Sequence, residues 1–101
     1  MKTAEVEIDW NGKKELVRLR RLTFGEINQL TEDSTDIRVS NGQPVMKISQ
    51  KVMRENGLLK SIVEAPFTIC LSEIQNLDFE IGTKLFQAFE ELNSQESKKK
   101  D

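Results

Sequence analysis

The stretch that decides the fold is DFEIGTKLFQAFEELN, residues 78–93. At about 100° per residue, a helix over this stretch places four apolar side chains in one narrow stripe. These are Ile81, Leu85, Ala88 and Leu92. Charged and amide side chains occupy most of the opposite face, and Asp78 has the side chain of an N-cap. The stretch therefore predicts a helix that packs on the core of the domain.

Two aromatic rings on this helix lie outside the apolar stripe. Phe79 and Phe86 project about 140–160° from Ile81 on the helical wheel, so the apolar arc is wider than one buried stripe requires. Either another part of the chain covers these rings, or they bind a partner protein. Phe79 and Phe86 are therefore candidate partner-binding residues.

The N-terminal residues predict a β-hairpin. Between residues 3 and 9, acidic side chains alternate with Ala4, Val6 and Ile8, which is the pattern of a half-buried strand. Asn11-Gly12 favours a type I′ turn, and a second strand follows over residues 16–19. Trp10 lies at the tip, where it either closes the end of the core or stays partly exposed as a third candidate partner-binding residue.

A basic cluster, Arg18-Leu19-Arg20-Arg21, ends the second strand. Together with Lys13 on the same sheet, its arginines could contact RNA or DNA. Alternatively, they pair with Glu5 and Glu7 across the hairpin. The formal net charge of -2 favours the second interpretation, because a nucleic-acid surface needs an excess of positive charge.

Capping signals predict further helices. Thr23 and Glu26 have the spacing of a capping box, and the helix that follows has an apolar face: Phe24, Ile27 and Leu30. Ser49 is the N-cap of a middle helix, which Gly57 either interrupts or splits in two. The apolar positions expected for this middle helix are Val52, Leu59, Ile62 and Val63. Ser72 starts a brief helical turn before the last helix.

Residues 37–48 carry weaker signals of a second hairpin. Ile37 and Val39 alternate with polar residues, and Asn41-Gly42 again offers a turn. Pro44 cannot donate to a ladder, so this segment is either a hairpin or a mobile excursion between helices.

Together these elements predict an α+β fold, with an N-terminal β-hairpin, and a second hairpin if it forms, packed on three to four α-helices. The chain of 101 residues is long enough for one core. Residues 1–93 are expected to form a single compact domain. Residues 94–101 hold no apolar side chain and are expected to form a disordered polar tail.

Composition points away from catalysis. The chain has no histidine and one cysteine, so the commonest general base and a cysteine zinc site are missing. We expect no enzyme activity, no cofactor and no metal, and Cys70 is expected to be a buried structural thiol. The acidic N-terminal residues and the absence of a long apolar run predict a cytoplasmic protein without a membrane segment.

Three segments carry a family resemblance: VRLRRLTFGEINQL after the first turn, GLLKSIVEAPF in the middle, and KLFQAFEELN before the polar tail. In length and layout they resemble the small tail assembly chaperones of long-tailed bacteriophages and prophages. The resemblance implies a non-catalytic protein that keeps the tape-measure protein soluble and assists assembly of the tail tube. The resemblance assigns no functional role to any individual residue of this chain. A small regulator that binds nucleic acid through Arg18–Arg21 is the alternative, and self-association is left open.

Overall fold

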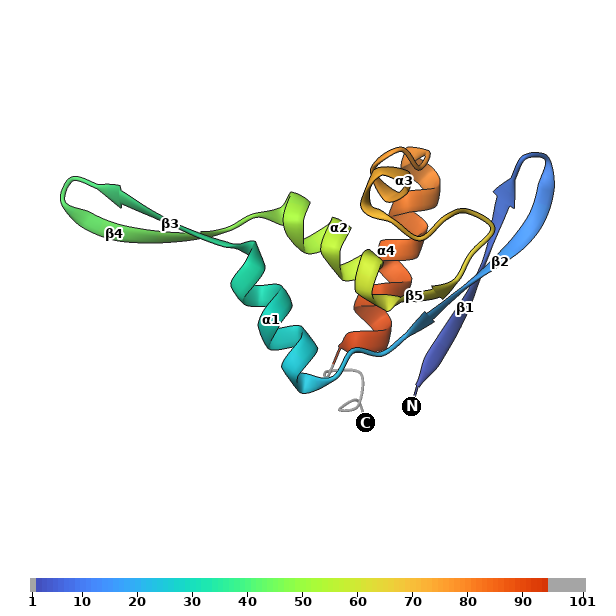
Figure 1. Ribbon diagram of the computed structural model, residues 1–101, viewed down its shortest axis with the longest axis horizontal. Coiled ribbons are helices and arrows are strands. Elements are labelled where there is room, and N and C mark those ends of the chain that lie inside the picture. The colour runs from blue at the N-terminus through green and yellow to red at the C-terminus, as the bar shows by residue number, and fades with distance from the viewer. Residues whose placement is uncertain (1, 95–101) are drawn as a thin grey trace.

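The computed structural model describes residues 2–94 and confirms the α+β fold, with two antiparallel sheets and helices beside them (Figure 1). The part of the tail from residue 95 on lies outside the described residues. In chain order the elements are β1 (Thr3–Trp10), β2 (Lys13–Arg20), α1 (Phe24–Ser34), β3 (Thr35–Ser40), β4 (Gln43–Ile48), α2 (Gln50–Ser61), β5 (Ile62–Glu64), α3 (Leu71–Gln75) and α4 (Phe79–Asn93).

The first hairpin forms as the sequence predicts. Asn11 and Gly12 have φ angles of 51° and 82°, as a type I′ turn requires at both central positions. This turn sets the register so that Val6 lies opposite Val17. Because side chains alternate along a strand, one face of the hairpin is mainly apolar and buried, and the other carries most of the charges. The buried side chains are Val6, Ile8, Val17 and Leu19.

A third strand completes this sheet, which the sequence did not predict. Helix α2 ends at Ser61, and residues 62–64 form β5, which pairs antiparallel with β2. The expectation of helix through Ile62 and Val63 was therefore wrong. Ile62 is buried against the sheet, whereas Val63 is exposed on its other side, which is the alternation of a strand.

Helix α4 packs on the apolar face of the first hairpin, mainly over β1 (Figure 1). Leu85 has no exposed surface and lies in the centre of the core. At the edge of the sheet, Lys84 Nζ donates a hydrogen bond of 2.7 Å to the carbonyl oxygen of Glu7 on β1. At the end of α4, Asn93 Oδ1 accepts from the backbone amide of Leu22 at 2.9 Å. These bonds tie the helix to the middle of β1 and to the segment that follows β2.

Helix α1 begins with the predicted capping box, in which Thr23 accepts from the amide of Glu26 and Glu26 accepts from the amide of Thr23. Its predicted apolar face is only partly correct. Leu30 is buried and Ile27 is half-buried, but Phe24 is 83% exposed because the first turn of α1 extends beyond the neighbouring helix.

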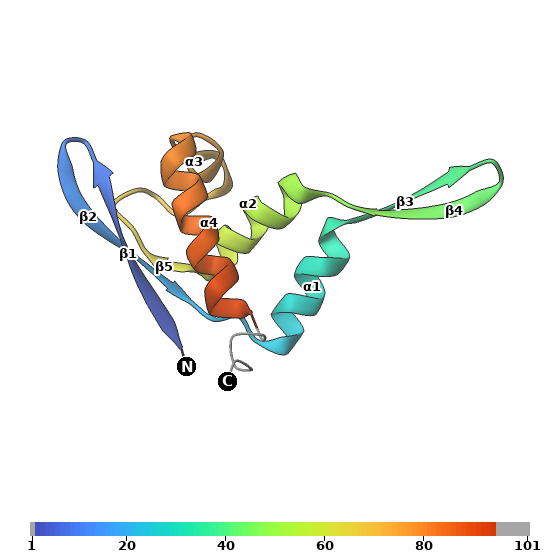
Figure 2. The ribbon, with the colours of Figure 1, turned by 180° about the vertical axis from the view of Figure 1, so that it is seen from behind.

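Residues 35–48 form the second hairpin, which is a separate two-stranded sheet. It projects away from the helices and the first sheet in both views (Figures 1 and 2). The molecule measures 54 × 37 × 20 Å and has a radius of gyration of 15.5 Å, compared with about 13 Å for a compact domain of this length. The shape is therefore a compact body that carries an extended arm.

Candidate functional site

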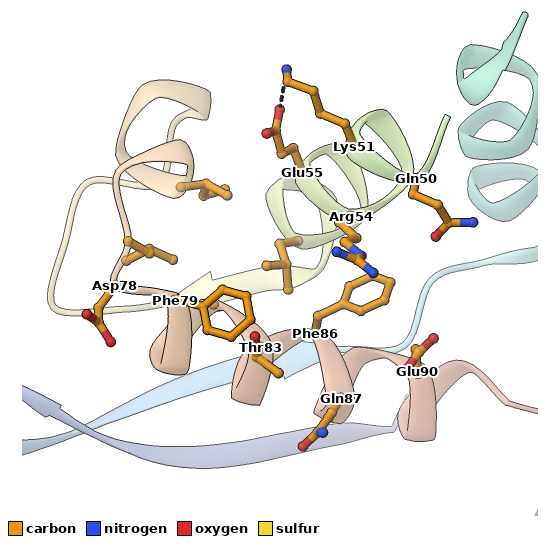
Figure 3. A pocket seen from close by; sticks show the side chains of 14 residues that line it. Gln50, Lys51, Arg54, Glu55, Asp78, Phe79, Thr83, Phe86, Gln87 and Glu90 are labelled. Carbon is orange, nitrogen blue, oxygen red and sulfur yellow. Dashed lines mark hydrogen bonds and ion pairs between the residues drawn. The ribbon is translucent and has the colours of Figure 1, made fainter. Parts of the chain in front are cut away.

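A groove of about 690 Å³ lies between α2 and α4 and is closed at one end by α3 and the turn after it (Figure 3). Its floor is apolar and consists of Leu58, Ile74, Leu77 and Phe86. Polar and charged side chains line its edges. Such a concave apolar surface with a polar edge is typical of sites that bind a ligand or a peptide segment.

The two candidate residues on α4 meet in this groove. Phe79 occupies the first position of α4 and is 81% exposed. Phe86 is half-buried, and its ring stacks on Phe89 with centroids 5.4 Å apart and an interplanar angle of 22°. Phe86 therefore belongs partly to the core, whereas the ring of Phe79 is available at the edge of the groove.

Gly57 allows α2 and α4 to approach closely below the groove. A Cβ atom at this position would lie 2.9 Å from Cζ of Phe89, closer than carbon atoms pack in protein interiors. The glycine does not split α2, which is continuous from Gln50 to Ser61. Its place in the helix is explained by the ring that packs against it.

Charged groups of both signs line the groove. The Arg54 guanidinium lies 5.7 Å from the centroid of the Phe86 ring and covers it from the α2 side (Figure 3), a distance at which a cation is attracted to an aromatic face. Glu55 accepts from Lys51 Nζ at 3.2 Å and from Gln75 Nε2 at 2.9 Å. Asp78 and Glu90 lie on the α4 side.

Trp10, the third candidate residue, lies elsewhere. Its ring packs against Phe67 with centroids 5.3 Å apart and a tilt of 46°. Trp10 is half-buried and adjoins the core at the tip of the first hairpin. The structure thus brings Phe79 and Phe86 together but places Trp10 outside the groove.

Leu58 and Arg54 are among the groove residues that sequence reasoning missed. The predicted face of the middle helix contained Leu59, whereas Leu58 is the side chain that is buried. A signal was present in Gly57 and Ser61, two small residues four positions apart, which mark the side of a helix that approaches another backbone. No local sequence pattern marks Arg54, because its place in the groove depends on the ring of Phe86, which belongs to the distant helix α4.

The basic residues of β2 are paired with carboxylates. Arg18 contacts Glu5 at 3.1 Å and Glu64 at 2.7 Å, so the predicted pairing with Glu5 is confirmed; Glu7 instead lies opposite Leu16. Arg20 donates two hydrogen bonds, of 2.8 and 2.7 Å, to the carboxylate of Glu26. These bonds, together with the amide of Thr23, lower the pKa of Glu26 from 4.5 to about 2.

Cys70 is partly exposed at the start of α3, so the prediction of a buried thiol was wrong. Its Sγ lies 3.5 Å from the hydroxyl of Ser72, and this hydrogen bond lowers the pKa of the thiol. The segment before α3 runs along the surface, which explains the exposure.

Within residues 2–94, no group of three or more potential ligands is arranged to hold a metal ion. No helix in the same range has the length and apolar character needed to cross a membrane. Comparison with known proteins found no matching family model, no matching curated protein and no matching solved structure.

Proposed function

We propose that this chain is a non-catalytic protein-binding domain that holds an apolar segment of a client protein in the groove between α2 and α4. The observation that carries the proposal is Phe79, an aromatic side chain that is 81% exposed beside an apolar floor. Aromatic side chains are enriched among the residues that dominate binding energy. Burial of such a ring by a partner is therefore strongly favourable.

The chemistry of the groove favours an amphipathic segment as the occupant. The apolar face of such a segment would pack on the floor at Leu58 and Phe86. Its acidic side chains could pair with Arg54 on the α2 side, and its basic side chains could pair with Glu90 on the α4 side. An amphipathic helix in an apolar groove is a recurring mode of peptide recognition.

The resemblance to tail assembly chaperones supplies the client class. On that basis we assign the tape-measure protein as the client, held soluble until the tail tube assembles around it. The alternative function, binding of nucleic acid by β2, is weakened because Arg18 and Arg20 are engaged by carboxylates of the same chain. The carboxylates beside both guanidinium groups offset the positive charge that phosphate binding needs.

Co-expression with a tape-measure fragment tests the proposal. Phe79→Ser removes the exposed ring from the groove, and we expect it to lower the soluble fraction of the client several-fold. Substitutions at exposed positions usually change stability by less than ~0.5 kcal/mol, so the fold should be retained. Phe86 is unsuitable for this test, because its stacking on Phe89 couples it to the core.

Phe24→Ser is a matched control. Phe24 also occupies the first position of a helix and is 83% exposed, but it lies on α1, outside the groove. The control should keep full solubilisation of the client. Equal loss in both variants, or loss in neither, would contradict a binding site at the groove.

A further inference from the structure

The second hairpin has one apolar face, which follows from its register. Residues directly opposite in an antiparallel pair lie on the same face, and the pairs Ile37–Met46, Val39–Pro44 and Thr35–Ile48 alternate with Asp36–Lys47, Arg38–Val45 and Ser40–Gln43. One face is therefore mainly apolar, and the other carries polar side chains and Val45. We call the apolar side the arm face; its residues are Ile37, Val39, Pro44, Met46 and Ile48.

Nothing within residues 2–94 covers the arm face. Ile37, Val39, Met46 and Ile48 are 65%, 77%, 69% and 52% exposed. The contacts of β3 and β4 are almost entirely with each other. Isolated two-stranded hairpins are marginally stable in water at best, and a contiguous exposed apolar surface commonly marks an interaction site.

The chain itself is poorly placed to cover this face. At the base of the hairpin, the amide of Ser49 donates a bond of 2.7 Å to the carbonyl of Ser34, and the Ser34 hydroxyl, which is buried, donates to the carbonyl of Leu30 at 2.7 Å. The first of these bonds closes the base of the hairpin, and the arm points away from the body in both views (Figures 1 and 2). The C-terminal residues 95–101, with the sequence QESKKKD, hold no apolar side chain that could cover the arm face.

We infer that the arm face docks on the same face of a second copy of this chain. The face carries no charged residue, so two copies meet without burying an unpaired charge. Two sheets stack about 10 Å apart through their apolar faces. A two-fold axis between two identical hairpins matches each face with one of equal length and width, as in an isologous interface.

The size of the arm face sets the strength of this dimer. Each strand has six residues, which gives a face about 20 Å long and about 10 Å wide. Its area is thus about 200 Å², roughly a quarter of the ~800 Å² per partner of a standard interface. We therefore expect a weak, reversible dimer with a dissociation constant of about 100 μM, rather than a permanent one.

Sedimentation velocity over about 1 μM to a few hundred μM tests the inference with the full chain. The wild type should shift from monomer to dimer over this range. Ile37→Thr with Met46→Thr replaces one facing pair on the arm face while keeping residues that favour strands, and it should raise the dissociation constant at least about tenfold. A wild type that stays monomeric throughout overturns the inference.

Val45→Thr is the matched control, because Val45 is 40% exposed and belongs to the opposite face of the same hairpin. It should leave the dissociation constant within about twofold. An equal effect of Val45→Thr overturns the assignment to the arm face. Phe79→Ser distinguishes a second arrangement: if it weakens self-association as much as the double substitution, the arm docks in the groove of the other copy and not on the other arm.

This test is separate from that of client binding. A chain that dimerises through the arm face but does not solubilise a tape-measure fragment upholds this inference and contradicts the proposed function. A monomeric chain whose hairpin amides gain protection from hydrogen exchange only with the client overturns this inference, because the client is then the occupant.

Discussion

At the residue scale, Gly57 on α2 and Gly82 on α4 differ in the space that is available for a side chain. Gly57 faces the ring of Phe89, whereas a Cβ atom at Gly82 on α4 would have no other atom within 4 Å. Both glycines lie inside helices, where alanine is intrinsically better by about 1 kcal/mol. The difference between them is therefore a matter of packing alone.

We predict that Gly57→Ala lowers the free energy of unfolding by about 1–2 kcal/mol. Its methyl group forces Phe89 to move in a packed core, and we expect an overpacking cost of about 2–3 kcal/mol, which exceeds the gain of about 1 kcal/mol in helix propensity. Gly82→Ala should raise the free energy of unfolding by about 0.5–1 kcal/mol. Denaturant unfolding of both variants measures these values, and stabilisation by both would show that the ring of Phe89 yields without cost.

The pair Arg20–Glu26 predicts a pH dependence of stability. The pKa of Glu26 is about 2 in the folded chain and 4.5 in the absence of the fold. A lowered folded pKa contributes stability that is complete above the unfolded value and is lost as the pH falls towards the folded value. This contribution should therefore disappear between about pH 5 and pH 2.

Glu26→Gln tests this expectation, because glutamine keeps the capping box but cannot ionise. The variant should be less stable than the wild type at pH 7, and the difference should shrink as the pH falls from about 5 to 2. Unfolding measured across this range gives the result. A difference that is independent of pH would show that the hydrogen bonds, and not the charge, provide the effect.

At the scale of elements, the second hairpin is structurally independent of the body. No residue of the buried core cluster belongs to residues 35–48. The ends of α1 and α2 are already joined by the bond between Ser34 and Ser49, so a short turn can connect them at little loop-closure cost.

We predict that replacing residues 35–48 by a short Gly-Ser turn leaves the body folded. Its thermal midpoint should change by less than about 3 °C, because no core contact is removed. The thermal midpoint should be measured at a concentration at which the chain is monomeric, so that loss of self-association does not lower it. A large drop in the midpoint, or loss of cooperativity, would show that the hairpin supports α1 and α2.

At the scale of the whole molecule, the arm extends from the end of α2 at which the groove begins. The hairpin joins α2 at Gln50 and projects away from the body, whereas the groove runs along α2 towards α3 (Figures 1 and 3). A dimer through the arm face would leave both grooves open. Two grooves on one dimer would bind a long client by two segments at once, with a gain in avidity that needs no new contact.

The sequence by itself determined the elements whose signals are local. Alternation and Asn11-Gly12 specified the first hairpin, and the side chains of Thr23, Ser49 and Asp78 specified where three helices begin. A cap, a turn and an apolar stripe depend on residues within a few positions of one another, so they can be read without knowledge of the fold. Leu85 and its stripe were predicted correctly for the same reason.

The tertiary structure decided what depends on distant parts of the chain. Residues 62–64 form a strand because β2 offers them an edge, although their local pattern also fits a helix. Phe24 and Leu30 lie on one face of α1, yet only Leu30 is covered, because α1 and α2 lie close together near β3 and diverge towards the first turn of α1 (Figure 1). The groove lies between α2 and α4, whose close approach below it Gly57 allows by leaving room for the ring of Phe89. Burial and pairing are properties of contacts between elements, and these contacts are made only when the whole chain has folded.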